Sequence, residues 1–237
     1  MTKSSPSLAA RGFTLIEFLV TMAAIGILAA IAVPALNSAF ERAKATKDLS
    51  NLRQIGAATQ LFMNDNNGVF PGGAQTWMSQ LEQNQKYLSA WRGLQSPFDK
   101  RALSEAGTGS PVSPVSYGIN PLVYISGAAI SADKITKPVT FIVFSPAQDV
   151  GNTVKFNADA TANAPAPGVT ESAGTSNPGG AASGGTHTSR TKINALCADW
   201  HAETMLWSGT GPAFTNNTAT GTDPEGELRW KPYTPFP

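Results

Sequence analysis

One stretch of the sequence constrains the fold more than any other. Residues 13–36 form an apolar run of 24 residues that contains a single charge, Glu17. As a helix rising about 1.5 Å per residue it would span roughly 36 Å, enough to cross the ~30 Å hydrocarbon core of a bilayer. Lys3 and Arg11 precede the run, and positive charge on that side predicts a cytoplasmic N-terminus.

Three interpretations of this segment are open. Ala30-Ile31-Ala32 is similar to a signal-peptide cleavage site, and cleavage there would leave a chain that begins at Val33. The segment is otherwise suited to a permanent membrane anchor. Glu17 suggests a further role, because a carboxylate costs about 2.5 to 3.5 kcal/mol at the membrane centre and such residues are usually functional. The alternative for Glu17 is a hydrated position near the interface.

The residues around Glu17 carry a specific motif. Residues 11–17 read Arg-Gly-Phe-Thr-Leu-Ile-Glu, which resembles the type IV prepilin cleavage and methylation motif. Pro34 lies where members of that family often carry a helix-bending proline. The resemblance covers residues 1 to about 55 and implies that residues 1–12 are a leader peptide. It also implies that a prepilin peptidase cuts between Gly12 and Phe13 and that Phe13 is then N-methylated.

The same resemblance implies a function. The chain would be a structural subunit of a type IV pilus-like filament or a type II secretion pseudopilus, with no enzymatic activity and no cofactor. In the family, the residue corresponding to Glu17 attracts the N-terminal ammonium of a neighbouring subunit. Opposite charges about 4 Å apart attract by roughly 4 kcal/mol at an effective dielectric near 20, before desolvation is subtracted. Such a pair would set the register between subunits.

Partners and location follow from the resemblance as well. We expect contacts with the prepilin peptidase, identical or related pilin-like subunits, an inner-membrane assembly platform and membrane lipid. The precursor would lie in the bacterial inner membrane with its head in the periplasm, and the mature subunit in a periplasmic pseudopilus or cell-surface filament. The net charge of +1 gives no electrostatic footprint for nucleic acid, which we therefore do not expect as a partner.

The apolar run continues into an amphipathic segment. Six charges within residues 41–53 indicate a return to water: Glu41, Arg42, Lys44, Lys47, Asp48 and Arg53. A helical stripe of Leu49, Leu52, Ile55, Thr59 and Phe62 is suited to packing on a globular domain. Asn and Gly residues at 64–68 then favour a helix end. We expect one helix over residues 13–65, of which 13–36 span the membrane.

Residues 66–237 predict an α+β head, in which the long helix packs on a small antiparallel sheet with long loops. Residues 77–91 predict a short helix, and residues 116–120, 122–125 and 139–144 predict strands. Residues 157–186 are almost entirely small or polar, which is typical of a long surface loop. A β-hairpin is expected over residues 193–198 and 202–207, with its turn at 199–201.

The head also resembles a subgroup of pseudopilin-like proteins common in planctomycetes and verrucomicrobia. Residues 116–120 fit its Ser-Tyr-Gly-x-Asn segment, and His187 precedes an Ala-Asp-x-His turn at residues 198–201. Trp200 stands where that turn usually has Gly, whose tolerance of positive φ the turn would use. If the turn only closes the fold, replacing Trp200 by Gly is expected to preserve or slightly raise stability.

Two groups of residues in the head have the donor atoms for a metal site. His187, Cys197, Asp199 and His201 have the right donor atoms, but a turn would separate them, and we expect turn polarity and a buried cysteine with no metal. A nucleophilic Cys197 with either histidine is less favoured still, because nothing nearby marks an activated thiol. A calcium site would use Asp223, Glu225 and Glu227, although the EF-hand pattern is absent.

The alternative to a filament subunit is a membrane-anchored or secreted enzyme or binding protein whose site lies in the C-terminal head. The sequence contains no nucleophile elbow, phosphate-binding loop or zinc-protease motif that would favour a familiar enzyme class. Its single cysteine excludes an internal disulfide. The N-terminus of the mature protein separates these functions, because it would lie at Phe13, near Val33 or at Met1.

Overall fold

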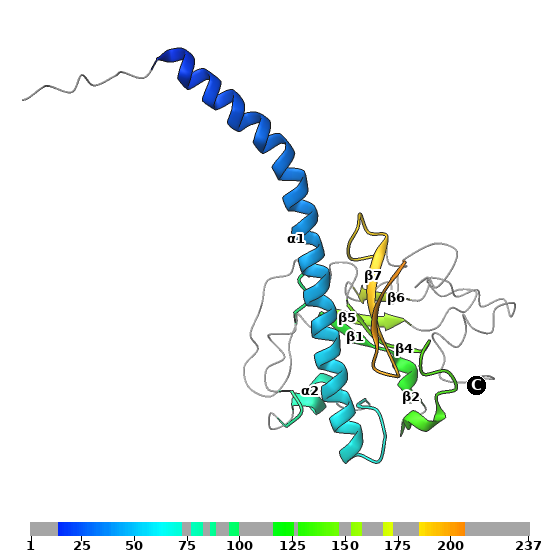
Figure 1. Ribbon diagram of the computed structural model, residues 1–237. Helices are drawn as coiled ribbons and strands as arrows, with labels where there is room; N and C mark the ends of the chain where they lie inside the picture. The colour runs from blue at the N-terminus through cyan, green and yellow to red at the C-terminus, as the bar shows by residue number, and fades with distance from the viewer. Residues whose placement is uncertain are drawn as a thin grey trace, which may run out of the picture. The chain divides into compact units, whose positions relative to one another are not determined.

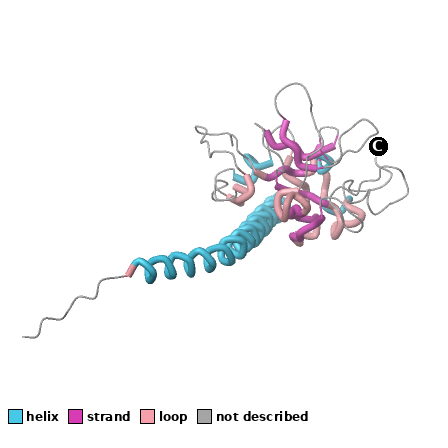
Figure 2. Tube along the Cα trace, turned by 90° about the horizontal axis from the view of Figure 1, so that it is seen from above, coloured by secondary structure: helices cyan, strands magenta, loops and turns pink. Residues whose placement is uncertain are grey.

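A computed structural model gives the fold in two compact units, residues 1–42 and 43–237. The long helix α1 (Leu15–Asp65) runs through both, so the predicted long N-terminal helix is confirmed. Within the second unit, the last part of α1 lies beside the strands (Figures 1 and 2). The structure describes residues 14–72, 77–82, 86–88, 95–99, 116–125, 128–146, 153–157, 168–172 and 185–206.

A four-stranded antiparallel sheet forms the centre of the second unit. Its strands are β1 (Tyr117–Ile119), β4 (Ile142–Pro146), β7 (Lys192–Cys197) and β8 (Ala202–Leu206), in the spatial order β1-β4-β7-β8. All three neighbouring pairs are antiparallel, and a bulge interrupts the pairing of β4 with β7. The expected α+β fold, a long helix with a small antiparallel sheet, is therefore confirmed.

The amphipathic part of α1 packs on this sheet. Leu52 and Ile55 are fully buried in the main hydrophobic cluster, as the helical stripe predicts. Gly56 allows the close approach, because a Cβ atom there would lie 2.9 Å from Leu196 Cδ2 on β7. The helix ends where expected, at Asp65, and the N–H of Gly68 donates to the carbonyl of Met63 in a Schellman-type cap.

The remaining elements are short. They are α2 (Trp77–Glu82), the 3-10 helices η3 (Pro121–Val123) and η4 (Ala132–Lys134), and the paired strands β2 (Tyr124–Ile125) with β3 (Ala128–Ala129) and β5 (Thr153–Asn157) with β6 (Gly168–Ser172). The helix expected over residues 77–91 thus ends at Glu82 within the described residues, while 83–85 and 89–91 lie outside them.

Two predicted strands differ from the structure in their bounds. The strand expected over 122–125 begins only at Tyr124, because Asn120 Oδ1 accepts the N–H of Leu122 and its carbonyl accepts the N–H of Val123, which closes a 3-10 turn. The strand expected over 139–144 begins at Ile142. Before it, the carbonyl of Lys137 accepts the N–H groups of Thr140 and Phe141 and so holds a turn.

The expected loop over residues 157–186 is wrong in one part. Residues 168–172 form β6, which pairs with β5 in antiparallel register, Asn157 opposite Gly168 and Thr153 opposite Ser172. Val169 and Thr170 are β-branched, a residue type that favours strands, and the surrounding small residues obscured this signal in the sequence. Residues 158–167 and 173–184 lie outside the described residues.

Candidate functional site

The N-terminus of α1 is capped by two residues of the prepilin-type motif. Thr14 precedes the helix and its Oγ1 accepts the backbone N–H of Glu17 at 3.3 Å. Glu17 Oε2 accepts both the backbone N–H and the hydroxyl of Thr14, each at 2.8 Å. This reciprocal pattern is a capping box. The Thr-x-x-Glu spacing is visible in the sequence and is the signal that predicts this cap, whereas the charge of Glu17 alone does not.

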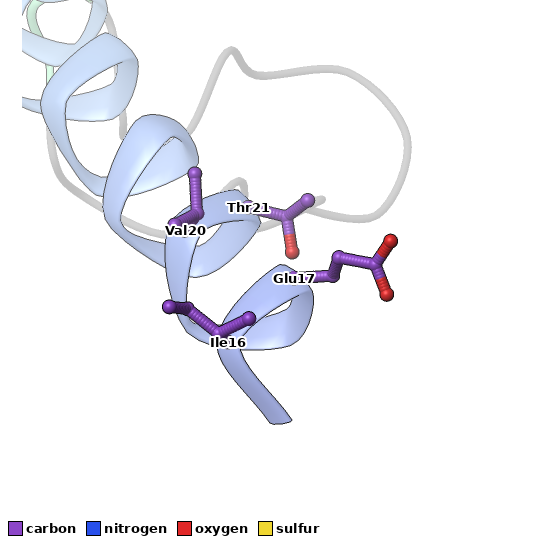
Figure 3. Close-up of a pocket in the computed structure, with 4 residues that line it drawn as sticks. All are labelled: Ile16, Glu17, Val20 and Thr21. Carbon is purple, nitrogen blue, oxygen red and sulfur yellow. The ribbon is translucent and has the colours of Figure 1, made fainter. Parts of the chain in front are cut away.

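Glu17 lies on an open surface of the helix. Together with Ile16, Val20 and Thr21 it lines a shallow groove, and Figure 3 shows its carboxylate pointing away from the helix. The apolar side chains around it are also exposed, from Leu15 at 82% onward along the helix. An 18-residue window of α1 has a mean hydropathy of 2.4 and none of it is buried, so the helix is long and apolar enough to cross a membrane.

Besides Glu17, the structure describes Pro34 but not the other predicted site residues of the N-terminus. Pro34 lies inside α1, as expected, and its missing N–H removes one hydrogen bond from the helix. Gly12 and Phe13 lie outside the described residues, so the predicted cleavage and methylation site is known from sequence alone. Asp223, Glu225 and Glu227, weighed above as calcium ligands, also lie outside the described residues.

The predicted C-terminal hairpin is confirmed as β7 and β8, but its turn lies at residues 198–200, one residue earlier than the expected 199–201, and residue 207 lies outside the described residues. At the turn, His201 Nδ1 lies 2.5 Å from Asp199 Oδ1 and His201 Nε2 lies 3.5 Å from Glu203 Oε1. Burial lowers the pKa of His201, but the hydrogen bonds and charges of Asp199 and Glu203 outweigh it and raise that pKa overall. Cys197, His201 and Glu203 each bring a ligand-type atom within 4.8 Å of the others.

His187 does not join this group. Its backbone pairs with Lys192 at the start of β7, whereas Cys197 lies at the end of that strand. Five residues of strand at about 3.3 Å each separate the two positions by roughly 16 Å. The His187 ring instead stacks on Phe98, with centroids 5.2 Å apart, and its Nδ1 lies 3.0 Å from the hydroxyl of Thr186. The structure therefore does not group the four candidates from the sequence, His187, Cys197, Asp199 and His201. It groups Cys197 and His201 with Glu203.

Trp200 adopts the positive φ of +71° that its turn position predicts. Its ring is more than a turn residue, however, because it packs against Phe70 with centroids 6.2 Å apart and belongs to the edge of the main cluster. Its Cε3 would also lie 3.4 Å from a Cβ placed on Gly56. The indole thus packs the hairpin against α1. Replacing Trp200 by Gly is therefore expected to lower stability and not to preserve or raise it.

A buried polar cluster joins α1 to the sheet and was missed in the sequence. Asp48 is fully buried, not solvated as its charged neighbours suggested. Its Oδ1 accepts the hydroxyls of Ser96 and Tyr117, both at 2.7 Å, and its Oδ2 accepts Asn194 Nδ2 at 2.8 Å. Burial raises the pKa of Asp48, and these three hydrogen bonds only partly oppose that effect. Asn194 also donates to the carbonyl of Ala45, so β7 is bonded to α1 twice.

The start of the chain is similar to a known sequence family. Residues 8–33 match the family model described as the prokaryotic N-terminal methylation motif. No curated protein and no solved structure matches the chain. The matched residues include Gly12, Phe13 and Glu17, and those from Leu15 onward form the apolar, exposed start of α1. The chain therefore carries a prepilin-type N-terminal motif on a membrane-length helix, which supports a type IV pilin-like or pseudopilin protein.

Proposed function

We propose that this protein is a structural subunit of a type IV pilus-like filament or a type II secretion pseudopilus. In this proposal a prepilin peptidase cuts the precursor between Gly12 and Phe13, and the mature chain assembles through the first part of α1. The observation that carries the proposal is the combination of the methylation motif with a helix whose large apolar side chains are exposed from Leu15 to Val33, the described helical part of the match.

The exposed part of α1 requires an apolar environment. Twelve large apolar side chains between Leu15 and Leu36 are more than half exposed. Burying side chains of this kind contributes about 1.5 to 3 kcal/mol each, so transfer from water is worth on the order of 20 kcal/mol. Lipid would supply this environment for the precursor. Helices of neighbouring subunits would supply it in a filament, where the same side chains exchange lipid for protein contacts.

Glu17 gives such a filament a register. Its Oε2 is already bonded to Thr14, which fixes the carboxylate at the first turn of the helix. Among the described residues, no hydrogen bond is made to its other oxygen, Oε1, which leaves an acceptor for the N-terminal ammonium of an adjacent mature subunit. Cleavage before Phe13 would create that ammonium. We therefore assign Glu17 to assembly and Thr14 to holding it in position.

Processing is tested by changing the residue before the proposed cut. Gly12 has no side chain and lets a protease hold the backbone extended, so Gly12→Val should block cleavage. With the peptidase present, mass spectrometry of wild type should give a 225-residue chain beginning at methylated Phe13, while Gly12→Val stays at 237 residues. Ala9→Val, a matched change inside the leader, should be cut normally. A Gly12→Val chain that still begins at Phe13 would remove the peptidase assignment.

A second measurement separates a filament subunit from an anchored enzyme or binding protein. Filaments sheared from cells that express the wild-type chain should contain it, and the Gly12→Val precursor should remain in the membrane fraction. The protein could be cut correctly and still be absent from filaments, even in cells that have the assembly apparatus. That result would favour the anchored alternative.

A further inference from the structure

The register of the β7–β8 hairpin gathers ligand-type side chains on one face. Ala195 lies opposite Glu203, and the backbone N–H of Cys197 donates to the carbonyl of His201 at the next step toward the turn. Because side chains alternate between faces, Cys197, His201 and Glu203 share one face. Leu196, whose side chain meets α1 near Gly56, belongs to the other face. The three residues therefore lie on the sheet face directed away from α1.

The imidazole is oriented for coordination. His201 Nδ1–H donates a hydrogen bond to Asp199 Oδ1 at 2.5 Å, so the neutral ring has its lone pair on Nε2. That atom faces Glu203 Oε1 at 3.5 Å, and the ligand-type atoms of Cys197, His201 and Glu203 all lie within 4.8 Å of one another. A carboxylate bonded to the far nitrogen of a histidine is the usual support for a metal-binding imidazole.

We propose that Cys197, His201 and Glu203 form a site for Zn²⁺ or a similar divalent cation of borderline softness, with Asp199 orienting the imidazole. One thiolate, one imidazole and one carboxylate are ligands that zinc accepts together. Calcium and magnesium prefer oxygen ligands, and a thiolate disfavours both. Three protein ligands leave a fourth tetrahedral position, which water fills.

The geometry needs only a modest contraction. Ligands at ordinary zinc distances lie about 3.6 Å from one another for a sulfur and a nitrogen, against the 4.8 Å limit found here. The side chains of His201 and Glu203 are 37% and 43% exposed, so they are able to close around an ion while the buried Cys197 stays in place. The site does not depend on cleavage or assembly at the N-terminus, and its test is independent of the proposed function.

Cobalt provides a direct readout because a thiolate bound to Co²⁺ gives a charge-transfer absorption band. The full chain, purified in detergent and freed of metal with a chelator, is titrated with Co²⁺ and then with Zn²⁺. We expect one equivalent of Co²⁺ to produce the thiolate band and tetrahedral visible bands, and Zn²⁺ to displace it. A folded full chain that gives neither band would overturn the proposal.

Variants assign the ligands. Cys197→Ser should lose the thiolate band. Glu203→Gln should bind Co²⁺ more weakly but should still show the thiolate band. Asp199→Asn should lower the affinity about 10- to 100-fold, since loss of an outer-shell partner has effects of that size. Asp133→Asn, the same change at an exposed site on η4, should leave the affinity unchanged. If Cys197→Ser does not fold, the partly exposed Asp199 and Glu203 decide, and wild-type affinity in both would contradict the site.

Discussion

Two carboxylates on the same helix have opposite surroundings. Glu17 is exposed near the start of α1, and among the described residues its carboxylate is bonded to Thr14 alone, one turn away. Asp48 is fully buried and is bonded to residues that lie 48, 69 and 146 positions further along the chain. The first part of α1 leaves its apolar surface and its charge exposed. In the later part of α1, apolar side chains such as Leu52 and Ile55 and the carboxylate of Asp48 are buried against the head of the same chain.

This difference shows how one helix serves two purposes. Desolvation of a lone carboxylate is expensive, so Asp48 is tolerated only because three donors reach it, and those donors fix which face of α1 meets the sheet. Within the part of the chain that the structure describes, the donors to the Glu17 carboxylate come from Thr14 alone, on the same turn of helix, and none comes from the head. Its exposed carboxylate is available to a second molecule, as the proposed role in assembly requires.

The largest effect should come from breaking the exposed side of this comparison. Glu17→Ala should insert into the membrane at least as well as wild type, because it removes a charge from the apolar helix. Its incorporation into filaments should nonetheless fall by an order of magnitude or more, measured by immunoblot of sheared filaments. Thr21→Val, which removes a polar but uncharged group from the same groove, is the control. Wild-type incorporation of Glu17→Ala would end the argument for this residue.

Breaking the buried side should destabilise the head instead. Asp48→Ala leaves the donors of Ser96, Tyr117 and Asn194 unpaired, and we expect a loss of about 3 kcal/mol in the free energy of unfolding. Denaturant unfolding of the full chain in detergent measures it. Lys47→Ala, at the exposed neighbouring position, should stay within about 0.5 kcal/mol of wild type. Equal stability of both variants would mean that the hydrogen bonds of Asp48 do not stabilise the packing of α1 on the sheet.

Two glycines of α1 sharpen the comparison further. A Cβ on Gly56 would press on Leu196 at 2.9 Å, whereas nothing lies within 4 Å of a Cβ on Gly26. Gly56→Val should therefore lower the free energy of unfolding of the head by about 1 to 3 kcal/mol, and Gly26→Val should leave it unchanged. Unfolding curves of the two variants, recorded side by side, test this. A loss of the same size in both would contradict the close packing of α1 on β7.

The smallest effect concerns the turn of the hairpin. Trp200→Gly relieves the strain of a positive φ but removes a ring packed on Phe70, and we now expect a net loss of about 1 kcal/mol. Trp200→Ala keeps the strain and loses the ring, so it should be about 1 kcal/mol worse than Trp200→Gly. Thermal or denaturant unfolding separates the two terms. An unchanged or raised stability of Trp200→Gly would restore the original expectation that the turn only closes the fold.

Sequence reasoning succeeded where the signal was local. The apolar run, its charged and amphipathic continuation and the alternating hairpin predicted α1, β7 and β8, because helix and strand periodicity depend on neighbouring residues. The starts of β2 and β4 were predicted too early, since hydrogen bonds to Asn120 and Lys137 hold turns before these strands. The capping box of Thr14 and Glu17 was also local, and its spacing made it predictable.

The partners of buried polar groups were not predictable in the same way. Asp48 belongs to a run of charges that suggests a solvated surface, and its donors come from three distant segments that only the fold brings together. Likewise, Glu203 joins His201 and Cys197 because of the pairing register of the hairpin. The sequence offered His187 as the second histidine, but the length of β7 holds it at the opposite end of that strand.

The mature N-terminus tests the central claim most directly. Protein isolated from membranes and from sheared filaments of cells that carry the matching prepilin peptidase is analysed by intact mass and by N-terminal peptide sequencing. We predict a chain of 225 residues that begins at N-methylated Phe13 in both fractions. A chain that begins at Val33, as after signal-peptide cleavage, or an intact chain that begins at Met1 would contradict the assignment as a processed pilin-like subunit.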